Sequence, residues 1–247
     1  MKYIREGMLM SDSVYKRILV KLSGEALGNG AVDGEILNFD ALDQICSVIK
    51  EVVDMGTQVA LLVGGGNIWR GARNGVSLDR ARADDMGMLA TMINCLALEQ
   101  SLKNAGVDAL AMSACEMNKV AQLFTARDAI NALNGGKVVI LGGGTGNPFF
   151  TTDTGAILRA LEIKADIAFL AKNIDGIYTA DPRVDPTAVK YDTLTYAEIL
   201  EKNLKATDPA STCLAMENGL PILLFALDDP DNIVKAARGE SIGTIVK

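Results

Sequence analysis

The chain contains no histidine, the side chain that most often serves as a general base near neutral pH. This absence excludes His-ligated metal sites and every mechanism that relies on an imidazole. Any acid–base or transfer chemistry must therefore use Lys, Arg, Asp, Glu or backbone dipoles.

Cysteine is scarce, and none of the four cysteines forms a CxxC pair. Cys46, Cys95, Cys115 and Cys213 lie among apolar residues, which is typical of buried free thiols rather than of disulfides or metal ligands. We therefore predict no metal ion held by protein side chains. The motif GxxxxGK[ST] is also absent, which argues against a P-loop kinase.

No apolar run is long enough to span a membrane, and residues 1–17 lack the apolar core and cleavage site of a secretory signal. The net charge of −7 disfavours nucleic acid as a partner. We expect a soluble cytoplasmic protein in which residues 1–14 form a loose N-terminal extension. Because the overall field repels anions, a phosphate-bearing substrate needs local Lys, Arg, metal ions or backbone N–H groups.

Short apolar strands alternate with helical patterns along the chain. Strands are expected at 17–22, 58–63, 108–112, 137–141, 167–171 and 221–225, and helices at 40–56, 85–105, 155–163, 195–204 and 209–218. This alternation predicts a three-layer α/β/α sandwich with a mostly parallel central sheet. Ligands bind such sheets beyond the carboxyl ends of the strands, so the loops after residues 22, 63, 141 and 171 form the candidate site.

Two of the expected helices carry further information. Helix 40–56 is expected to be capped by Asp40 at its start and by Gly56 at its end. Helix 85–105 is apolar on nearly every side. Such a helix is either buried within one subunit or covered by a second subunit, and the sequence leaves both open.

The first two loops place cations and glycines after apolar strands. VKLSGEAL (20–27) offers a lysine at the strand end, and LLVGGGNIWRG (61–71) offers three glycines and then Arg70. Glycine lets the backbone approach a ligand without a Cβ clash, and the arginine fork suits phosphate oxygens. The alternative for the first loop is an ordinary surface lysine, and the alternative for the second is a tight turn. Arg70 favours phosphate binding in the second loop.

The remaining two loops add side chains that suit a nucleotide. GGGTGNPFFTTD (142–153) repeats the strand-then-glycine pattern and adds hydroxyl, amide and aromatic groups. It indicates a second half of the same cleft, and the alternative is a turn into a helix capped near Asp153. In AKNIDGIYTADPRVDP (171–186), Tyr178 could stack on a flat base, and Asp181 could hold a ribose, a metal ion or a turn.

Taken in this order, the loops resemble those of the amino-acid kinase superfamily and, within it, the bacterial uridylate (UMP) kinases. The resemblance covers residues 15–247 and is carried by KLSGE, GGGNIWRG, DDMGMLAT, GTGNPFFTTD and DGIYTADP. GTGNPFFTTD resembles the sequence of the UMP kinase subfamily specifically, since carbamate, acetylglutamate, glutamate-5 and aspartate kinases have other sequences there. The resemblance implies one domain of carbamate kinase-like fold over 15–247, in which about 15–155 binds the phosphate acceptor and about 156–247 binds ATP.

The resemblance implies that the protein phosphorylates UMP to UDP with ATP and Mg²⁺, in pyrimidine nucleotide biosynthesis. Lys, Arg, glycine N–H groups and Mg²⁺ would stabilise charge during direct transfer to the UMP phosphate. It also implies a homohexamer, a trimer of dimers, that is activated by GTP and inhibited by UTP. The stretch 28–40 departs from the family wording near the family's effector contacts.

The resemblance also assigns roles to individual residues. The catalytic residues would be Lys21 and Arg70. ATP would be bound by Lys21, Leu22, Ser23, Gly24, Gly66, Arg70, Tyr178, Asp181 and either Lys172 or Asn173. UMP would be bound by Gly65, Asp84, Thr145, Gly146, Asn147, Pro148, Phe149, Phe150, Thr151 and Thr152, with Asp84 reaching the ribose.

Two other functions stay open at this point. One is a different small-molecule kinase of the same fold, which would phosphorylate a carboxylate or carbamate. Such an enzyme needs cations in its acceptor loop, and TGNPFFTT contains none. The other is a non-catalytic nucleotide sensor, against which the presence of Lys21 and Arg70 argues.

Overall fold

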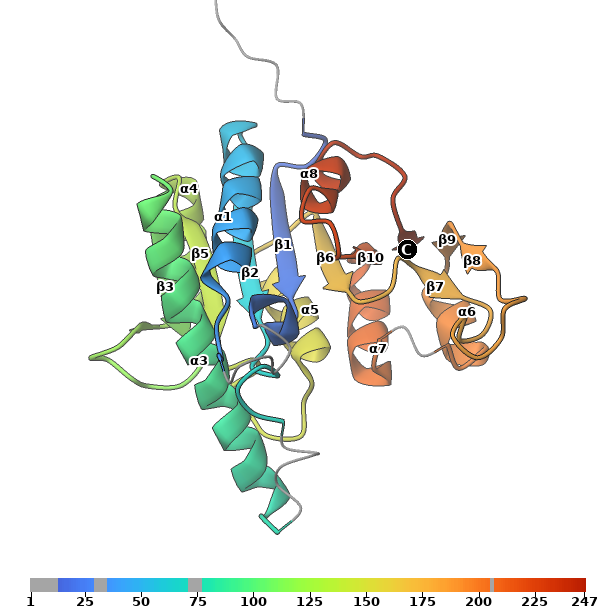
Figure 1. Ribbon diagram of the computed structural model, residues 1–247, viewed down its shortest axis with the longest axis horizontal. Helices are drawn as coiled ribbons and strands as arrows, with labels where there is room; N and C mark the ends of the chain where they lie inside the picture. The colour runs from blue at the N-terminus through green and yellow to red at the C-terminus, as the bar shows by residue number, and fades with distance from the viewer. Residues whose placement is uncertain (1–12, 29–34, 71–76, 205–206) are drawn as a thin grey trace, which may run out of the picture.

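The computed structural model describes residues 13–28, 35–70, 77–204 and 207–247. Most of the predicted N-terminal extension and part of the stretch 28–40 lie outside these residues. The described chain forms one large mixed α/β body in which helices cover both faces of a central sheet (Figure 1). The predicted fold class is confirmed.

The central sheet has nine strands within the described residues, in the order β4–β3–β5–β2–β1–β6–β10–β11–β9. Neighbouring strands are parallel except for β10 and β11. The strands are β1 (Arg17–Leu22), β2 (Gln58–Val63), β3 (Ala109–Ser113), β4 (Gln122–Leu123), β5 (Val138–Gly142), β6 (Ile167–Lys172), β9 (Thr193–Leu194), β10 (Ile222–Ala226) and β11 (Thr244–Val246). A separate antiparallel pair joins β7 (Ile177–Tyr178) to β8 (Lys190–Tyr191).

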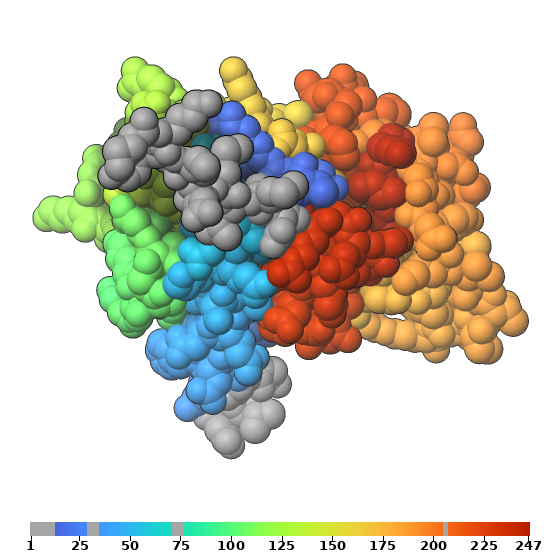
Figure 2. Space-filling model, turned by 90° about the horizontal axis from the view of Figure 1, so that it is seen from above, coloured from blue at the N-terminus to red at the C-terminus, as the bar shows by residue number. Residues whose placement is uncertain are grey.

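Two helical layers cover the sheet. One face carries α1 (Phe39–Asp54), α3 (Arg80–Asn104) and α8 (Asn232–Ala237), and the other carries α4 (Ala126–Asn134), α5 (Thr152–Glu162), α6 (Tyr196–Glu201) and α7 (Pro209–Asn218). A short 3₁₀ helix, η1 (Gly24–Leu27), follows β1. Seen from above, the β7–β8 region lies at the end of the molecule opposite α3 and α4 (Figure 2).

The alternation of side chains along the strands determines which residues face α5. Leu19 on β1 and Leu170 on β6 belong to the core on the α5 face of the sheet. Since successive side chains of a strand point to opposite faces, Lys21 and Lys172 point to that same face two residues later. Both strands therefore end with a lysine directed towards α5.

Two predictions about helix ends need correction or extension. Asn38, not Asp40, caps α1, because its side chain accepts a hydrogen bond from the Ala41 N–H at 3.1 Å. Gly56 follows the end of α1 with φ of 87°, a left-handed conformation that favours glycine. Helix α3 begins at Arg80, before the predicted start at residue 85, because Asp79 caps it.

Helix α3 is not covered on every side by its own chain. Leu89 is 57% exposed and Ile93 is 49% exposed, and both lie on the outer face. The interpretation of this helix as wholly buried within one subunit is therefore wrong. Neither α3 nor any other helix among the described residues has the length and apolar character needed to cross a membrane.

The four cysteines are free thiols, and the prediction that they are buried holds for two of them. Cys46 and Cys95 are buried, whereas Cys115 and Cys213 are half-buried. Burial is the main cause that raises the pKa of Cys46 to about 12, and the charge of Asp43 adds to it. At neutral pH this thiol is protonated and behaves as a small apolar side chain.

Candidate functional site

Two cavities open at the carboxyl edge of the neighbouring strands β5, β2, β1 and β6, where the sequence predicts the candidate loops. One, of about 310 Å³, lies between the loops that follow β2 and β5, and we call it the glycine cavity. The other, of about 590 Å³, lies between the end of β6 and the β7 segment, and we call it the hairpin cavity. The end of β1 lies between them.

The glycine cavity brings together most of the residues predicted for the phosphate acceptor. The residues predicted for UMP that line it are Gly65, Asp84, Thr145, Asn147, Phe150, Thr151 and Thr152. Gly66, which was predicted to bind ATP, lines this cavity and not the hairpin cavity. Gly146, Pro148 and Phe149 belong to the same loop but do not line the cavity. Among the lining residues that were not predicted individually are Trp69, Gly87, Met88 and Thr91. Gly87, Met88 and Thr91 lie within DDMGMLAT, one of the motifs that carry the family resemblance. That motif could have identified them as site residues.

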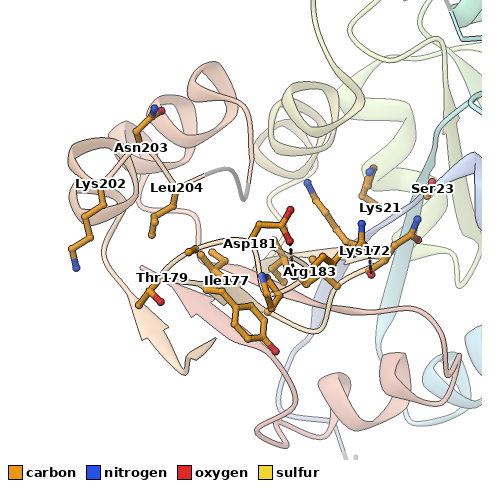
Figure 3. A pocket seen from close by; sticks show the side chains of 17 residues that line it. Lys21, Ser23, Lys172, Ile177, Thr179, Asp181, Arg183, Lys202, Asn203 and Leu204 are labelled. Atoms are coloured by element: carbon orange, nitrogen blue, oxygen red, sulfur yellow. Dashed lines mark hydrogen bonds between the residues drawn. The ribbon is translucent and has the colours of Figure 1, made fainter. Parts of the chain in front are cut away.

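The hairpin cavity brings together residues predicted for ATP. The predicted residues that line it are Lys21, Ser23, Lys172, Asn173, Tyr178 and Asp181. In Figure 3, Lys21, Ser23 and Lys172 lie at one end of this cavity and Lys202, Asn203 and Leu204 at the other. Leu22 is buried in the core, and Gly24 is buried against the Gly64–Gly66 backbone. Neither of these two residues, which were predicted to bind ATP, lines the cavity.

A buried carboxylate joins the ends of β1 and β6. Asp153, at the start of α5, lies 3.1 Å from the Lys21 Nζ through Oδ1, and it accepts a hydrogen bond from the Lys172 Nζ at 2.5 Å through Oδ2. All three side chains are largely withdrawn from solvent. Two cations around one anion leave a net positive centre between the two cavities.

The interpretation of the loop 142–153 as a turn into a helix capped near Asp153 describes the start of α5, but it assigns Asp153 no partner. Thr151 caps α5, because its side chain accepts a hydrogen bond from the Thr154 N–H. Burial alone would raise the pKa of Asp153, but the two ammonium groups outweigh it and hold the pKa below its usual value. The signal that could have found it is the strand alternation, which directs both lysines to the face covered by α5.

The two glycine loops differ from residue to residue in what they contact. A Cβ on Gly65 would lie 2.8 Å from the Ala90 Cβ, and a Cβ on Gly142 would clash with the Met92 sulfur. By contrast, no heavy atom lies within 4 Å of the same position on Gly144. Gly65 and Gly142 are therefore needed so that α3 can pack closely, whereas Gly144 has open space around it.

Several backbone N–H groups in these loops are available to a ligand. Gly65, Gly66, Gly144 and Thr145 line the glycine cavity. Over the described part of the chain, no intramolecular hydrogen bond occupies the N–H groups of these four residues. Converging N–H groups form a site that suits an anion such as phosphate.

Comparison with known proteins assigns this arrangement to a family. The sequence matches the amino acid kinase family over residues 16–226. The chain belongs to the amino acid kinase family.

Solved structures of kinases share the whole fold. The UMP kinase of Bacillus anthracis matches with a TM-score of 0.90 and 36% identity, over 94% of this chain and 96% of that one. The UMP kinase of Ureaplasma parvum matches with a TM-score of 0.89 and 36% identity, over 94% and 98%. The uridylate kinase of Archaeoglobus fulgidus matches with a TM-score of 0.72 and 27% identity, over 93% and 99%. The resemblance that the motifs indicate is confirmed.

In this amino acid kinase, Asp84 connects α3 to the second glycine loop. Its carboxylate accepts a hydrogen bond from the Phe149 N–H at 2.8 Å and from the Arg80 Nε at 2.9 Å, both through Oδ2. Phe149 has φ of 73°, which is rare for a residue with a side chain, and it is 65% exposed. Conformations of this kind cost free energy and are concentrated at ligand sites.

Arg70 lines neither cavity, and it forms an ion pair with Glu25 of the KLSGE motif. Its Nε also donates a hydrogen bond to the Gly66 carbonyl at 2.9 Å. Asn173, from the other side of the site, donates to the second oxygen of Glu25 at 3.2 Å. Glu25 thus connects the Arg70 loop to the end of β6.

Asp208 ties the start of α5 to α7. Its carboxylate accepts hydrogen bonds from the Thr151 hydroxyl at 2.6 Å, from the Thr154 hydroxyl at 2.9 Å and from the Ser211 N–H at 3.1 Å. Burial would raise the pKa of Asp208, but these donors, that of Thr151 first, hold it below its usual value. The predicted ligand residue Thr151 is therefore also part of the frame of α5.

The hairpin cavity contains an aromatic ring and a carboxylate, as predicted. The Tyr178 hydroxyl donates a hydrogen bond to Asp175 at 2.8 Å, and this bond raises the pKa of the phenol. Asp181 accepts a hydrogen bond from the Arg183 N–H at 3.0 Å, so it stabilises the turn as well as lining the cavity. In the described ranges, no three His, Cys, Asp or Glu side chains gather as they would around a metal ion.

Proposed function

We propose that this protein transfers the γ-phosphate of ATP to UMP and produces UDP, with UMP in the glycine cavity and ATP in the hairpin cavity. The observation that carries this proposal is the Lys21–Asp153–Lys172 cluster between the two cavities. The transferred phosphoryl group must pass between donor and acceptor, and we place that path at the end of β1, which lies between β2 and β6 and carries Lys21. The division into an acceptor part at 15–155 and an ATP part at 156–247 follows from the same assignment.

The chemistry suits a site without histidine. Phosphoryl transfer proceeds through a loose transition state with charge on the equatorial oxygens, so positioning and electrostatics matter more than a general base. Lys21 and Lys172 are held in fixed positions by Asp153, which limits the reorganisation needed during the reaction. The attacking oxygen belongs to the UMP phosphate, which is already ionised at neutral pH.

The predicted Mg²⁺ fits an ion that is carried by the nucleotide. Asp153, the carboxylate nearest the transfer path, is engaged by both lysines. Mg²⁺ keeps several waters and binds phosphate oxygens readily, so the ATP phosphates and water can ligate it without a protein side chain. When bound, the ion would neutralise charge on the β- and γ-phosphates.

UMP as the acceptor is supported by the shape of the loop and by its relatives. The loop presents the N–H groups of Gly144 and Thr145, the Asn147 amide and the Phe150 ring to the glycine cavity. Two solved structures that share 36% of the sequence are UMP kinases. A carboxylate or carbamate kinase would need a cation among residues 145–152, and the sequence contains none there.

A coupled assay of ADP formation tests the proposal. Purified protein with ATP and Mg²⁺ is offered UMP, CMP, AMP, carbamate and acetylglutamate in parallel, and the product is identified as UDP. We expect turnover with UMP to exceed that with every other acceptor. Equal turnover with all five acceptors, or preference for an acid, would contradict it.

A variant pair separates catalysis from nucleotide sensing. Lys21→Ala removes one ammonium group of the transfer centre, and Lys137→Ala removes an exposed lysine that pairs with Asp108 elsewhere. We expect Lys21→Ala to abolish most turnover and Lys137→Ala to leave it unchanged. Unchanged turnover in Lys21→Ala would favour a non-catalytic sensor.

The apolar face of α3 supports the proposal that the protein self-associates. Met86, Leu89 and Ile93 follow helical spacing and are exposed in the isolated chain. A second copy is the occupant that the predicted homohexamer would place there. Leu89→Glu should lower the mass measured by light scattering.

GTP activation, UTP inhibition and cytoplasmic location remain predictions of the resemblance.

A further inference from the structure

Helix α3 holds both glycine loops through two buried polar side chains. The Asn94 side chain is fully buried and donates hydrogen bonds to the Gly64 carbonyl at 2.7 Å and to the Asn67 side chain at 2.8 Å. One turn earlier, the Thr91 hydroxyl accepts a hydrogen bond from the Gly143 N–H at 2.7 Å. The two loops come from different strands, and α3 forms hydrogen bonds with both.

Direct packing reinforces these hydrogen bonds. A Cβ on Gly65 would lie 3.0 Å from the Thr91 N, so the first loop already touches the helix backbone. A Cβ on Gly142 would lie 2.8 Å from the Cys95 sulfur, so the second loop touches the next turn. Closely packed interiors transmit small displacements, and neither loop can move towards α3.

The hydrogen bonds to α3 also determine which loop groups remain for a ligand. The Gly143 N–H points to Thr91 and is not available to phosphate. The next N–H groups, those of Gly144 and Thr145, line the glycine cavity opposite Gly65 and Gly66. Thr91 and Asn94 lie three residues apart on one face of α3. Their separation therefore sets the distance between the N–H groups of the first loop and those of the second.

We infer that Thr91 and Asn94 are positioning residues that hold the two glycine loops at the separation required to bind the acceptor phosphate. Neither residue takes part in the transfer step. The inference rests on the proposed function, because it takes the phosphate of the acceptor nucleotide as the ligand of the glycine cavity. It also explains why a polar, fully buried asparagine lies on the inner face of an apolar helix.

Thr91→Val tests the inference, with Thr91→Ser as the conservative partner. Valine has the shape of threonine but cannot accept the hydrogen bond of the Gly143 N–H, whereas serine keeps the hydroxyl. Because a buried donor is left unpaired, we expect the KM for UMP to rise about tenfold in Thr91→Val, with a smaller change in the KM for ATP. Thr91→Ser should restore the wild-type KM for UMP.

Thr57→Val is the matched control for a general loss of stability. Thr57 is buried at the opposite end of β2, and its hydroxyl donates to the Tyr15 carbonyl at 3.1 Å. We expect this variant to lower the melting temperature and to leave the KM for UMP unchanged. Hydrogen exchange supplies an independent readout, since the Gly143 amide should exchange faster in Thr91→Val only.

The outcomes separate this inference from the proposed function. Wild-type protein that does not phosphorylate UMP contradicts the proposed function. Wild-type protein that does so, with a Thr91→Val variant whose KM for UMP is unchanged, contradicts only the positioning role. Asn94→Ala provides a second test, because it should also raise the KM for UMP.

Discussion

The glycine cavity and the hairpin cavity are built in different ways. The glycine cavity is lined by two glycine-rich loops and by residues of α3, which also packs against both loops. The hairpin cavity is lined mainly by side chains between Lys172 and Arg183, with Lys202–Leu204 at its far end (Figure 3). Substitutions at the glycine-cavity positions that pack against α3 should therefore change stability and binding together, whereas those in the hairpin cavity should change binding alone.

The largest effect is expected where the two cavities meet. Asp153→Asn removes the charge that holds Lys21 and Lys172, so the two ammonium groups repel each other across the transfer path. We expect kcat to fall by roughly 10²-fold or more, since fixed electrostatic groups supply effects of this size. Steady-state kinetics with UMP measure it. Asp108→Asn, at an exposed ion pair, is the control, and a kcat within threefold of wild type would contradict the role of Asp153.

A smaller effect is expected in the hairpin cavity. Tyr178→Ala removes a ring that lines it and whose hydroxyl donates a hydrogen bond to Asp175. Stacking of a base on an aromatic ring contributes about 1–3 kcal/mol, so the KM for ATP should rise roughly tenfold or more. The KM for UMP and the melting temperature should stay unchanged.

Tyr178→Phe separates the ring from its hydroxyl. The ring remains and the hydrogen bond to Asp175 is lost, so we expect a KM for ATP close to wild type. A Phe variant as impaired as the Ala variant would show that the hydroxyl, not the ring, contributes to binding.

Two adjacent glycines should respond differently to alanine. At Gly65 the new Cβ meets α3, so Gly65→Ala should lower the free energy of unfolding by about 1–3 kcal/mol. At Gly66 the nearest atoms lie 3.8 Å and 3.9 Å away, so Gly66→Ala should fold normally and weaken nucleotide binding instead. Chemical denaturation measures the first effect and titration with nucleotide the second. Equal stability of the two variants would contradict this distinction.

The smallest effect concerns the frame of α5 and depends on pH. The pKa of Asp208 is lowered in the folded protein, so its contribution is complete above the usual carboxyl pKa near 3.8 and is lost as the pH falls below that value. Asp208→Asn keeps one acceptor oxygen and should lower the free energy of unfolding at pH 7 by about 1 kcal/mol. The difference from wild type should shrink in denaturation curves measured at progressively lower pH. A difference that grows on acidification would contradict this sign.

Much of the site could be predicted because the relevant signals are local. Each predicted strand is a short apolar run, and in parallel sheets the carboxyl ends of such strands meet at one edge. Lys21 and Lys172 lie at the carboxyl ends of two of these strands, and Gly66 and Thr145 lie in the loops that follow two others. Their position at one edge of the sheet therefore follows from the pattern. The family motifs supported the same conclusion independently.

The errors came from competition between neighbouring residues. Asn38 and Asp40 are both good helix caps, and only the backbone geometry of the folded chain selects Asn38 for α1. Thr151 and Asp153 compete in the same way at the start of α5. Thr151 takes the cap, which leaves the Asp153 carboxylate free to pair with the two lysines.

By itself, the sequence determined the positions of the main strands, the edge at which a ligand binds and the groups that any chemistry must use. Those properties depend on composition and on residues close together in the chain. The tertiary structure decided the strand order, the pairing of Asp153 with Lys21 and Lys172, and the division of the glycines between helix packing and open cavity. These depend on contacts between distant segments, which exist only after α3 and α5 have packed on opposite faces of the sheet.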